Sequence, residues 1–528
     1  MDIKKKLFYI FLFIQAFLWS ILQLSRNIIS LDSMEAITWG ELLSFGTNKH
    51  PPLSGWLMGG IYNGFGQFDI LVYALGQICL IVGFIFVYKL AKQFMSEEKA
   101  FCASMILEFC FYYSYYIYVN SYNCNVVMMG LWSVVAYYFY KSVKENRLKD
   151  WILFGLTSGL AFLDKYQIVF LFIGLFLYLI IADREQFKKK GIYLSILVGS
   201  IVILPHVIWL FQNDFFSFAY MFERAEISSS ATSKFAIMLN HFIYPIKFIG
   251  DQILAVLPCV GIYLILAIQT KSFSSPSPQP SHAGIGGIPQ QFKEILKNSL
   301  SLRKRVGVKG QTTKLNSKDA FFLLSIGVIP VIAQGLMGAV TGNRVPGMWG
   351  TIMVSSAGIL LFTFFPIEFK ENTYKFFLKL AYVGLFISLI SVGFFAVFQT
   401  QHFIAFPHKT VEEFNKIWKE KTNTDLKYIT GNMEYVFQFR YYNSKRPQVI
   451  LDTFGHKNPW IKDENILKSG FIAIDKNEEM LINRVKNTVE HFPENVEIVP
   501  EVYTMNVCNK LNRCKNSSFY YTIIPPQE

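Results

Sequence analysis

The sequence predicts a polytopic α-helical membrane protein, with about eleven membrane-spanning helices and a small C-terminal extracytoplasmic α/β domain. Of the 528 residues, 52% are hydrophobic and only 16% are charged. Soluble domains carry roughly a quarter of charged residues, so this composition argues against a soluble chain. The apolar residues gather in long runs, and short basic loops separate many of them. Together these observations predict a membrane protein.

The apolar runs predict the spans in order. The basic run Lys4-Lys5-Lys6 precedes a first run that is too long for a signal sequence and lacks a small-residue cleavage site, so we expect a retained helix. The charged pair Asp164-Lys165 lies between two short runs. Because a bare charge pair at mid-bilayer is costly, we expect two helices with the pair at the interface and not one long helix. The predicted spans are Leu7–Ser25, Ile70–Leu90, Ala100–Val119, Cys124–Tyr140, Trp151–Leu163, Ile168–Ala182, Ile192–Phe211, Ile253–Gln269, Ala320–Val340, Gly347–Phe365 and Phe376–Phe398.

The basic residues predict the orientation. They precede the first span and follow the fourth, sixth and eighth spans, in the segments Lys141–Lys149, Arg184–Lys190 and Lys271–Lys318. All of these segments fall on one side of the membrane if the span count is right, and the positive-inside rule makes that side the cytoplasm. We therefore expect a multi-pass protein of a bacterial inner membrane, with the N-terminus inside and the C-terminus outside. This distribution also accounts for the net charge of +13 without nucleic acid as a partner.

Composition divides the chain into four regions. Residues 1–269 form a transmembrane catalytic region with a large outer loop at 26–69, and residues 319–398 form the last spans. The segment 270–318 is rich in Ser, Pro and Gly and then basic, which is typical of a flexible cytoplasmic linker. In the soluble domain at 399–528, Val411–Thr422 has a helical pattern, and Lys427–Ile429, Val449–Leu451 and Phe471–Ile474 have strand patterns.

Two cysteines lie near the end of the predicted soluble domain. Cys508 and Cys514 flank a five-residue segment. In an oxidising compartment they would form a disulfide, and in a reducing one they would remain free thiols.

The long first outer loop is the first place to look for chemistry, because helix connections in bundles are usually short. Asp32 and Glu35 are three residues apart, which puts both carboxylates on one face of a helix. Such a pair can hold a cation or supply a general base, or it can be an ordinary solvated pair. Lys49 and His50 precede a stiff Pro-Pro pair and suit an anionic phosphate, although snorkelling at the headgroups is the favoured explanation when the pair is taken alone.

Further polar residues lie at the predicted outer ends of the spans. Lys165 is on the side that the positive-inside rule disfavours, which makes it a candidate phosphate ligand with Asp164 as its partner. Asn123 and Asn125 can bond sugar hydroxyls or simply cap a helix. The remaining candidate substrate-binding residues are Tyr166, His206, Arg224 and Arg344.

At the first loop the sequence resembles the family-39 glycosyltransferases, which include protein O-mannosyltransferases and bacterial aminoarabinose transferases of lipid A. The resemblance is carried first by Leu31-Asp32-Ser33-Met34-Glu35-Ala36 with Trp39-Gly40, and by Lys49-His50-Pro51-Pro52-Leu53 with Trp56-Leu57. Further matches follow in order along the chain. They are Asn123-Cys124-Asn125, Leu131-Trp132, Gly159-Leu160-Ala161, Lys165-Tyr166, Pro205-His206 and Trp209.

The resemblance implies a fold of the GT-C type and an inverting transfer of sugar from a polyprenyl phosphate carrier on the outer face. Asp32 matches the acid proposed as catalytic base in the family, Glu35 matches a second acid, and Lys165 matches a basic residue that meets the lipid phosphate. Many members carry Glu-Lys where this chain has Lys49-His50, and that Glu has been linked to a metal. Many also carry an Asp where Asn123 or Asn125 stands. These two departures weigh against a divalent metal and against a second carboxylate, and no other cofactor is expected.

Three functions fit the sequence. The first is a transferase that moves a lipid-linked sugar to a glycolipid, such as lipid A, or to a protein. The second is a transporter or flippase of lipid-linked sugars, but transporters often show repeated halves with charges at the midplane, and no repeat is evident here. The third is an assembly protein of the cell envelope. The sequence leaves the sugar, the acceptor and the oligomeric state open.

Overall fold

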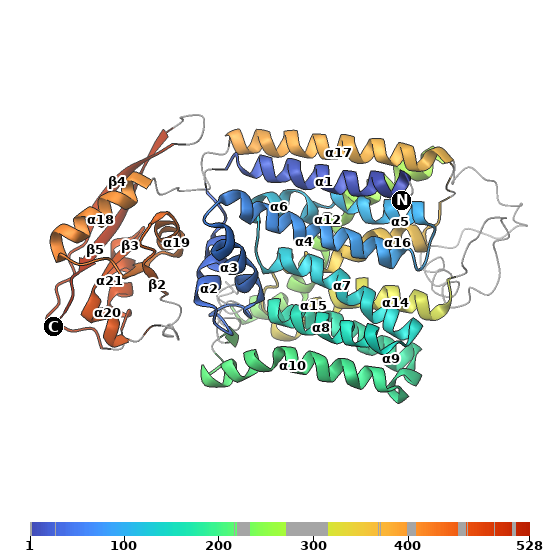
Figure 1. The fold of residues 1–528 in the computed structure, drawn as a ribbon, viewed down its shortest axis with the longest axis horizontal. Coiled ribbons are helices and arrows are strands. Elements are labelled where there is room, and N and C mark those ends of the chain that lie inside the picture. The colour runs from blue at the N-terminus through green and yellow to red at the C-terminus, as the bar shows by residue number, and fades with distance from the viewer. Residues whose placement is uncertain are drawn as a thin grey trace, which may run out of the picture.

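The computed structural model describes residues 3–26, 28–215, 217–218, 233–270, 315–367, 369, 371–398, 408–451, 461, 463–489, 491–508 and 514–527. These residues form a bundle of long helices followed by a small sheet domain (Figure 1). The N-terminus lies toward one end of the bundle, and the sheet domain lies beyond the other end.

Apolar helices build the bundle. Among the described residues, six helices are long and apolar enough to cross a membrane, or seven if the bent pair α14–α15 counts as one span. The predicted multi-pass helical class is therefore confirmed, whereas the count of eleven spans is not. The bundle helices are α1 (Ile3–Gln23), α4 (Asp69–Ala91), α5 (Glu97–Met105), α6 (Tyr115–Asn120), α7 (Cys124–Glu145), α8 (Leu148–Asp164), α9 (Val169–Ala182), α10 (Lys190–Gln212), α12 (Lys234–Gln269), α14 (Ser317–Gly327), α15 (Ile329–Thr341), α16 (Ala357–Phe364) and α17 (Glu371–Phe398).

Three predicted spans are interrupted. The span predicted at Ala100–Val119 consists of α5, two 3₁₀ turns and α6, through an aromatic-rich run whose side chains lose rotamer freedom in a helix. The span predicted at Gly347–Phe365 begins with two 3₁₀ turns before α16. The pair α14–α15 bends by 44°, and Pro330 lies directly after the break, where it cannot donate a helix hydrogen bond.

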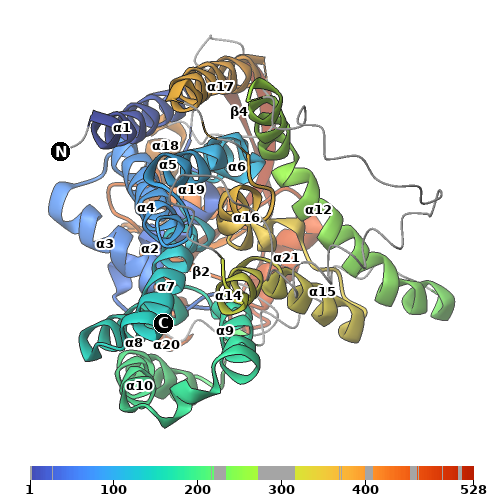
Figure 2. The ribbon, with the colours of Figure 1, turned by 90° about the vertical axis from the view of Figure 1, so that its right-hand side faces the viewer.

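The bundle has two opposite edges. At one edge α1 packs between α4 and α17, and at the other α10 packs along α8 (Figures 1 and 2). In between, α4 packs along α7 and α7 along α8. The large apolar side chains that point outward from α10, α12 and α17 suit a lipid environment.

Charged contacts tie the helices together at the end of the bundle that carries the N-terminus. Lys4 pairs with Glu98, and Lys318 Nζ lies 2.9 Å from Asp183 Oδ1. Tyr140 donates a hydrogen bond of 2.9 Å to Asp319. These residues belong to or adjoin segments that the positive-inside rule assigns to one side, so the described basic segments meet at one end of the molecule.

Two shorter helices, α2 (Leu31–Leu42) and α3 (Leu53–Phe65), lie across the opposite end of the bundle (Figure 1). They pack closely because glycines face each other at the crossing. A Cβ atom added to Gly40 would lie 2.3 Å from the Gly55 carbonyl oxygen and 2.5 Å from the Gly59 nitrogen. The small residues of the Trp39-Gly40 motif therefore serve the packing of this helix pair.

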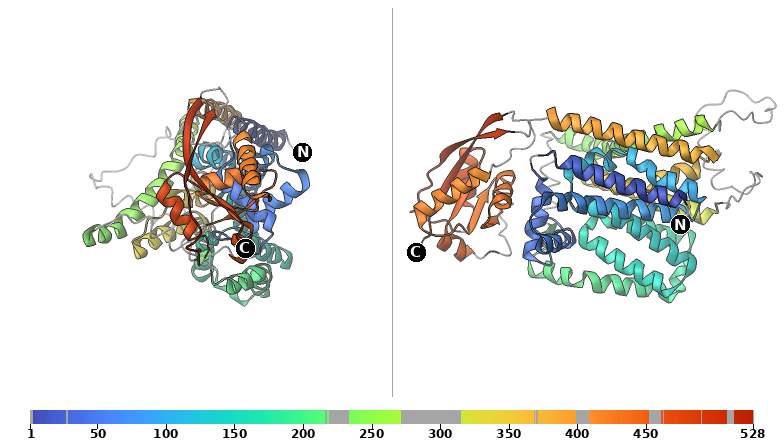
Figure 3. Two further views of the ribbon diagram at one scale, coloured as in Figure 1. Left: turned by 90° about the vertical axis from the view of Figure 1, so that its left-hand side faces the viewer. Right: turned by 45° about the horizontal axis from the view of Figure 1, so that its top comes forward.

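The C-terminal domain contains a five-stranded sheet in the order β2-β1-β3-β5-β4. Strand β1 pairs in parallel with β2 and β3, and β5 pairs antiparallel with β3 and β4. Figure 3 shows the long β4–β5 ribbon and the helices around the sheet. The elements are α18 (His408–Thr422), β1 (Tyr428–Gly431), α19 (Met433–Tyr442), β2 (Gln448–Ile450), α20 (Asp463–Ser469), β3 (Phe471–Asp475), α21 (Glu478–Lys486), β4 (Glu501–Cys508) and β5 (Cys514–Ile524).

Alternation along the strands builds two apolar layers. In β3, Ile472 and Ile474 face the cluster that contains α18 and α19, while Phe471 and Ala473 face the cluster with α20 and α21. The predicted small α/β domain is confirmed. Cys514 is disulfide-bonded, and the backbone of Cys508 lies opposite it in the register of the β4–β5 ribbon.

Candidate active site

Hydrogen bonds to the segment before α7 fix the start of α2, the helix that carries Asp32 and Glu35. Ser30 is the N-cap of α2, and its hydroxyl both accepts from the Ser33 backbone nitrogen and donates to the Asn120 carbonyl. The Ser33 hydroxyl donates to the Tyr122 carbonyl at 2.7 Å. The first turn of α2 is thereby held against the N-terminus of α7.

A chain of polar contacts runs from Asp32 to Lys165. Asn123 is the N-cap of α7 through its side-chain oxygen, and its Nδ2 donates to Asp32 Oδ2 at 2.9 Å. Asn123 and Asn125 both donate to the Tyr116 hydroxyl, at 3.3 and 2.8 Å, and Lys165 donates to Asn125 Oδ1. The fold thus brings together candidates that lie 133 residues apart in the chain. Asn123 thus caps α7, one of the two roles considered for it, and also contacts Asp32.

Lys165 is an ammonium group without a carboxylate partner in the described part of the chain. The residue is 8% exposed, and the neutral amide of Asn125 is the hydrogen-bond partner of its ammonium group. The expected ion pair with Asp164 is not formed, because both Asp164 oxygens are buried without a hydrogen-bond partner. Asp164 is the last residue of α8, whereas Lys165 is already in an extended conformation. A buried cation without a counterion favours an anion as ligand.

Glu35 is buried and forms an ion pair with Lys49. Glu35 thus lies inside the fold, whereas Asp32, one turn earlier, is exposed. Where members of the resembling family have the Glu linked to a metal, this chain has Lys49, whose ammonium already neutralises Glu35. The residues present do not fit a metal site, and the described residues contain no cluster of three or more metal-ligating side chains.

His50 lies among cationic groups. Its ring makes an edge contact with Trp39, and its carbonyl accepts hydrogen bonds from the backbone and hydroxyl of Thr47. Burial, and then the positive charges of Lys165 and Lys49, hold the pKa of His50 well below its ordinary value. His50 is therefore neutral at pH 7, and it can offer a hydrogen bond there but no charge.

Tyr166 and His206 anchor the loop that follows α2. His206 Nδ1 donates to the Phe45 carbonyl at 2.6 Å, so its Nε2 accepts from the Tyr166 hydroxyl at 2.8 Å. Gly46 lies against the Trp209 ring, where a Cβ atom would clash at 2.1 Å. We predicted that Tyr166 and His206 bind substrate. In the structure their described hydrogen bonds hold the loop after α2 on α10.

Of the two arginine candidates, only Arg344 lies in the described part of the chain, and it is not part of this network. Arg344 is exposed in the loop after α15, without an ion pair to any described residue. Arg224 lies outside the described residues. Sequence reasoning missed Tyr116, which joins the two asparagines, and Arg26, whose guanidinium bonds the carbonyls of Tyr118 and Val119 at the end of α6. Tyr116 lies in an aromatic run that resembles an ordinary span, and only the break before α6 distinguishes it.

The fold is that of a multi-pass membrane protein of the GT-C type. The crystal structure of ArnT from Cupriavidus metallidurans bound to undecaprenyl phosphate matches it with a TM-score of 0.52 at 12% identity, over 98% of this chain and 97% of that one. Residues 49–209 match the family profile described as dolichyl-phosphate-mannose-protein mannosyltransferase. That match includes Lys49, His50, the two asparagines and Lys165 but begins after Asp32 and Glu35. The resemblance predicted from the motifs is confirmed.

Two curated relatives from Rhizobium johnstonii are galacturonosyltransferases. The lipid A galacturonosyltransferase RgtD is 20% identical over 208 residues, which cover 37% of this chain and 42% of RgtD. The lipopolysaccharide core galacturonosyltransferase RgtA is 19% identical over 188 residues, which cover 35% of this chain and 38% of RgtA. The chain thus matches about two fifths of the length of each relative.

Proposed function

We propose that this protein is an inverting glycosyltransferase that moves a sugar from a polyprenyl phosphate carrier to a glycolipid acceptor. The two curated relatives are named for transfer to lipid A or to the lipopolysaccharide core, which supports a glycolipid over the alternative, a protein acceptor. The observation that carries the proposal is Lys165, a buried ammonium bonded to a neutral amide and linked through Tyr116 to the exposed carboxylate of Asp32. The ammonium of Lys165 suits a phosphate anion, and the carboxylate of Asp32 suits an acceptor hydroxyl.

The proposed reaction uses these two groups on opposite sides of the sugar. The acceptor oxygen forms a bond to the anomeric carbon as Asp32 takes the hydroxyl proton. The bond between that carbon and the phosphate oxygen breaks, and the phosphate leaves with the electron pair. Lys165 stabilises the charge on the leaving phosphate, and the anomeric centre is inverted. His50 would add a neutral hydrogen bond and Asn125 would orient Lys165, while Glu35 with Lys49 would stabilise the fold of α2.

We also propose that the site faces the outside of a bacterial inner membrane. The described basic segments meet at the end that carries the N-terminus, which favours that end as cytoplasmic. Helix α2, which carries Asp32, lies at the opposite end together with α3 and the C-terminal domain. A lipid-borne sugar would meet its acceptor there, without a nucleotide.

The test is transfer by the purified protein in detergent or proteoliposomes. Undecaprenyl phosphate linked to a uronic acid, a pentose or a hexose is offered with lipid A or core lipopolysaccharide, and products are identified by mass spectrometry. We expect one donor to give a covalent product. Asp32→Asn should lower kcat by about 10²- to 10⁴-fold, the usual contribution of a general base. Asp425→Asn, an exposed acid of the C-terminal domain, should retain wild-type transfer.

Two outcomes would reject the proposal. Transfer that survives in the Asp32→Asn variant would remove Asp32 as the base. Movement of the donor across proteoliposomes without a covalent product would favour the transporter instead.

A further inference from the structure

Helix α19 of the C-terminal domain lies directly against α2. All seven residues from Tyr435 to Tyr441 are buried, although the helix belongs to a small soluble domain. Phe437 and Phe439 of α19 share one apolar cluster with Met34 and Ile37 of α2. The core of the C-terminal domain is therefore continuous with the helix that carries Asp32.

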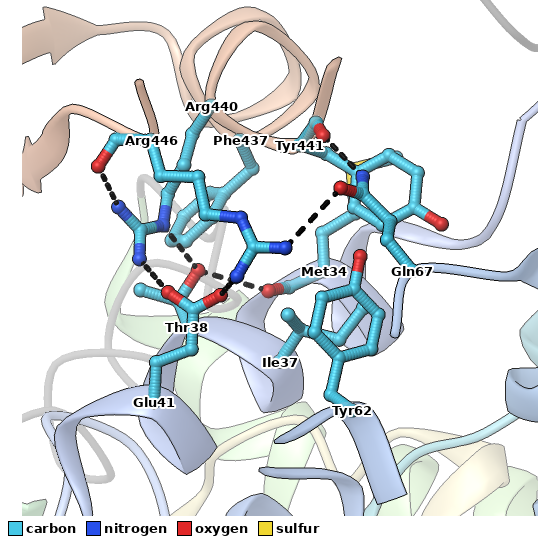
Figure 4. A pocket seen from close by; sticks show the side chains of 10 residues that line it. All are labelled: Met34, Ile37, Thr38, Glu41, Tyr62, Gln67, Phe437, Arg440, Tyr441 and Arg446. Carbon is cyan, nitrogen blue, oxygen red and sulfur yellow. Dashed lines mark hydrogen bonds and ion pairs between the residues drawn. The ribbon is translucent and has the colours of Figure 1, made fainter. Parts of the chain in front are cut away.

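Arg440 is the centre of a polar cluster where α19 meets α2, a contact that we call the seam (Figure 4). Its side chain is 9% exposed; its Nε donates to the Thr38 hydroxyl at 3.2 Å, and its terminal nitrogen pairs with Glu41. The other terminal nitrogen donates to the carbonyls of Arg446 and Pro447, at 2.7 Å each. Arg446 also pairs with Glu41, at 2.8 Å. One guanidinium thus connects two side chains of α2 to the backbone of the C-terminal domain.

The neighbouring contacts of α19 reach both sides of α2. The Tyr441 hydroxyl donates to Asp69, and the Gln67 amide donates to the Tyr441 carbonyl, so the far end of α19 is attached to the start of α4. At the N-terminal end of α19, Met433 Sδ lies 4.0 Å from Lys49 Nζ, the ammonium that pairs with Glu35. Helix α19 therefore spans the candidate site from Lys49 to Asp69.

Helix α19 contacts the side of α2 that is opposite to the candidate base, Asp32. Asp32 and Glu41 are nine residues apart, or about two and a half helical turns, so they point to opposite sides of α2. Asn123 holds Asp32 from the bundle side, and Arg440 holds Thr38 and Glu41 from the domain side. Because a guanidinium fork bonds in a fixed plane, this arrangement opposes rotation of α2 about its axis.

We propose that Arg440 is a positioning residue, through which the C-terminal domain fixes the orientation of α2 and hence of Asp32. This role rests on the proposed transferase function. It assigns the domain a part in the rate of the reaction, whereas the buried cation Lys165 is bonded to Asn125 of α7. Loss of the seam should therefore affect turnover more than donor binding.

The test compares Arg440→Lys, Arg440→Met, Glu41→Gln and the milder Thr38→Val with Lys445→Ala, which removes an exposed lysine of the same domain. Kcat, the KM for the donor, the apparent Tm and amide hydrogen exchange of residues 31–50 are measured for each. We expect kcat to fall at least tenfold in the Arg440 and Glu41 variants, with KM changed less than threefold and faster exchange in α2. Arg440→Lys keeps the charge but loses the fork, so it should resemble Arg440→Met. Lys445→Ala should match the wild type.

A lower Tm with unchanged kcat and unchanged exchange in α2 would overturn the proposal and leave only a structural contact. Thr38→Val removes only the two hydrogen bonds of the Thr38 hydroxyl, from Arg440 and to the Met34 carbonyl, and keeps the test decisive if the charge variants fail to fold. If the wild-type protein transfers no lipid-linked sugar, the proposed function fails, whereas the exchange measurement still decides whether Arg440 holds α2.

Discussion

At the scale of single residues, burial changes what each candidate can do. Asp32 and Glu35 are both carboxylic acids and lie three residues apart. Asp32 is exposed beside Asn123, whereas Glu35 is buried against Lys49. Lys49 and Lys165 differ in the same way: the first has a carboxylate partner, and the second has an amide. The basic residue that suits a phosphate is therefore Lys165, which lies far from the first loop in sequence.

Lys165 gives the first prediction at this scale. Lys165→Met should lower kcat/KM by about 10²- to 10³-fold, because the leaving phosphate loses a preorganised charge in a site of low dielectric constant. Initial rates over a range of donor concentrations measure the effect. Lys149→Met, an exposed basic residue of the opposite end, is the control. A variant with wild-type kcat/KM would show that Lys165 does not meet the phosphate.

His50 predicts a dependence of stability on pH. Burial and two ammonium groups keep its pKa in the folded protein well below the ordinary value of about 6.5. Between the folded pKa and 6.5 the unfolded chain binds the extra proton, so the free energy of unfolding is highest above pH 6.5 and falls with acidification. The loss approaches about 1.4 kcal/mol per pH unit from this one group.

Thermal unfolding in detergent between pH 7.5 and pH 5 measures this effect. His50→Asn should flatten the decline below pH 6.5, because the variant has no group to protonate there. His491→Asn, an exposed histidine of the C-terminal domain, should keep the wild-type slope. Equal slopes for wild type and His50→Asn would contradict the assignment.

At the scale of elements, the geometry of α2 depends on its neighbours. Its first turn is fixed by hydrogen bonds to Asn120 and Tyr122, and its last turns by the glycine contact with α3 and by Arg440. The sequence predicts the acids three residues apart on one helix. It does not predict that one side of this helix faces α7 and the other α19, because these contacts join segments about 90 and 400 residues away.

The close crossing of α2 and α3 gives a prediction with a control on the same helix pair. Gly40→Ala would place a Cβ atom 2.3 Å from a backbone oxygen of α3, so the helices must separate. We expect a loss of about 1–3 kcal/mol in stability, typical of overpacking, and a lower rate of transfer. Gly60→Ala, whose Cβ would meet nothing within 4 Å, should be neutral or slightly stabilising. Both are compared by thermal unfolding and by turnover; equal behaviour would argue against close packing.

At the scale of the whole molecule, the two ends of the bundle differ in chemistry. One end gathers the basic segments, and the other carries the candidate site and the sheet domain. Single cysteines introduced at Lys149 and Ser444, in a background without the native cysteines, test the orientation. A membrane-impermeant maleimide should label Ser444→Cys but not Lys149→Cys in intact spheroplasts. The reverse pattern would place the site on the cytoplasmic side, away from the proposed acceptor.

The sequence by itself determined the membrane class, the small C-terminal domain and the segments in which the site residues lie. It could do so because hydrophobic runs, basic loops and strand alternation are local patterns that depend on neighbouring residues in the chain. The tertiary structure alone decided which residues meet: that Lys165 bonds Asn125 instead of Asp164, that Tyr116 joins the asparagines, and that Arg440 holds α2. These contacts depend on how distant helices cross, and no local pattern encodes a crossing. The three interrupted spans have the same cause, since packing against neighbouring helices overrides the periodicity of a single apolar run.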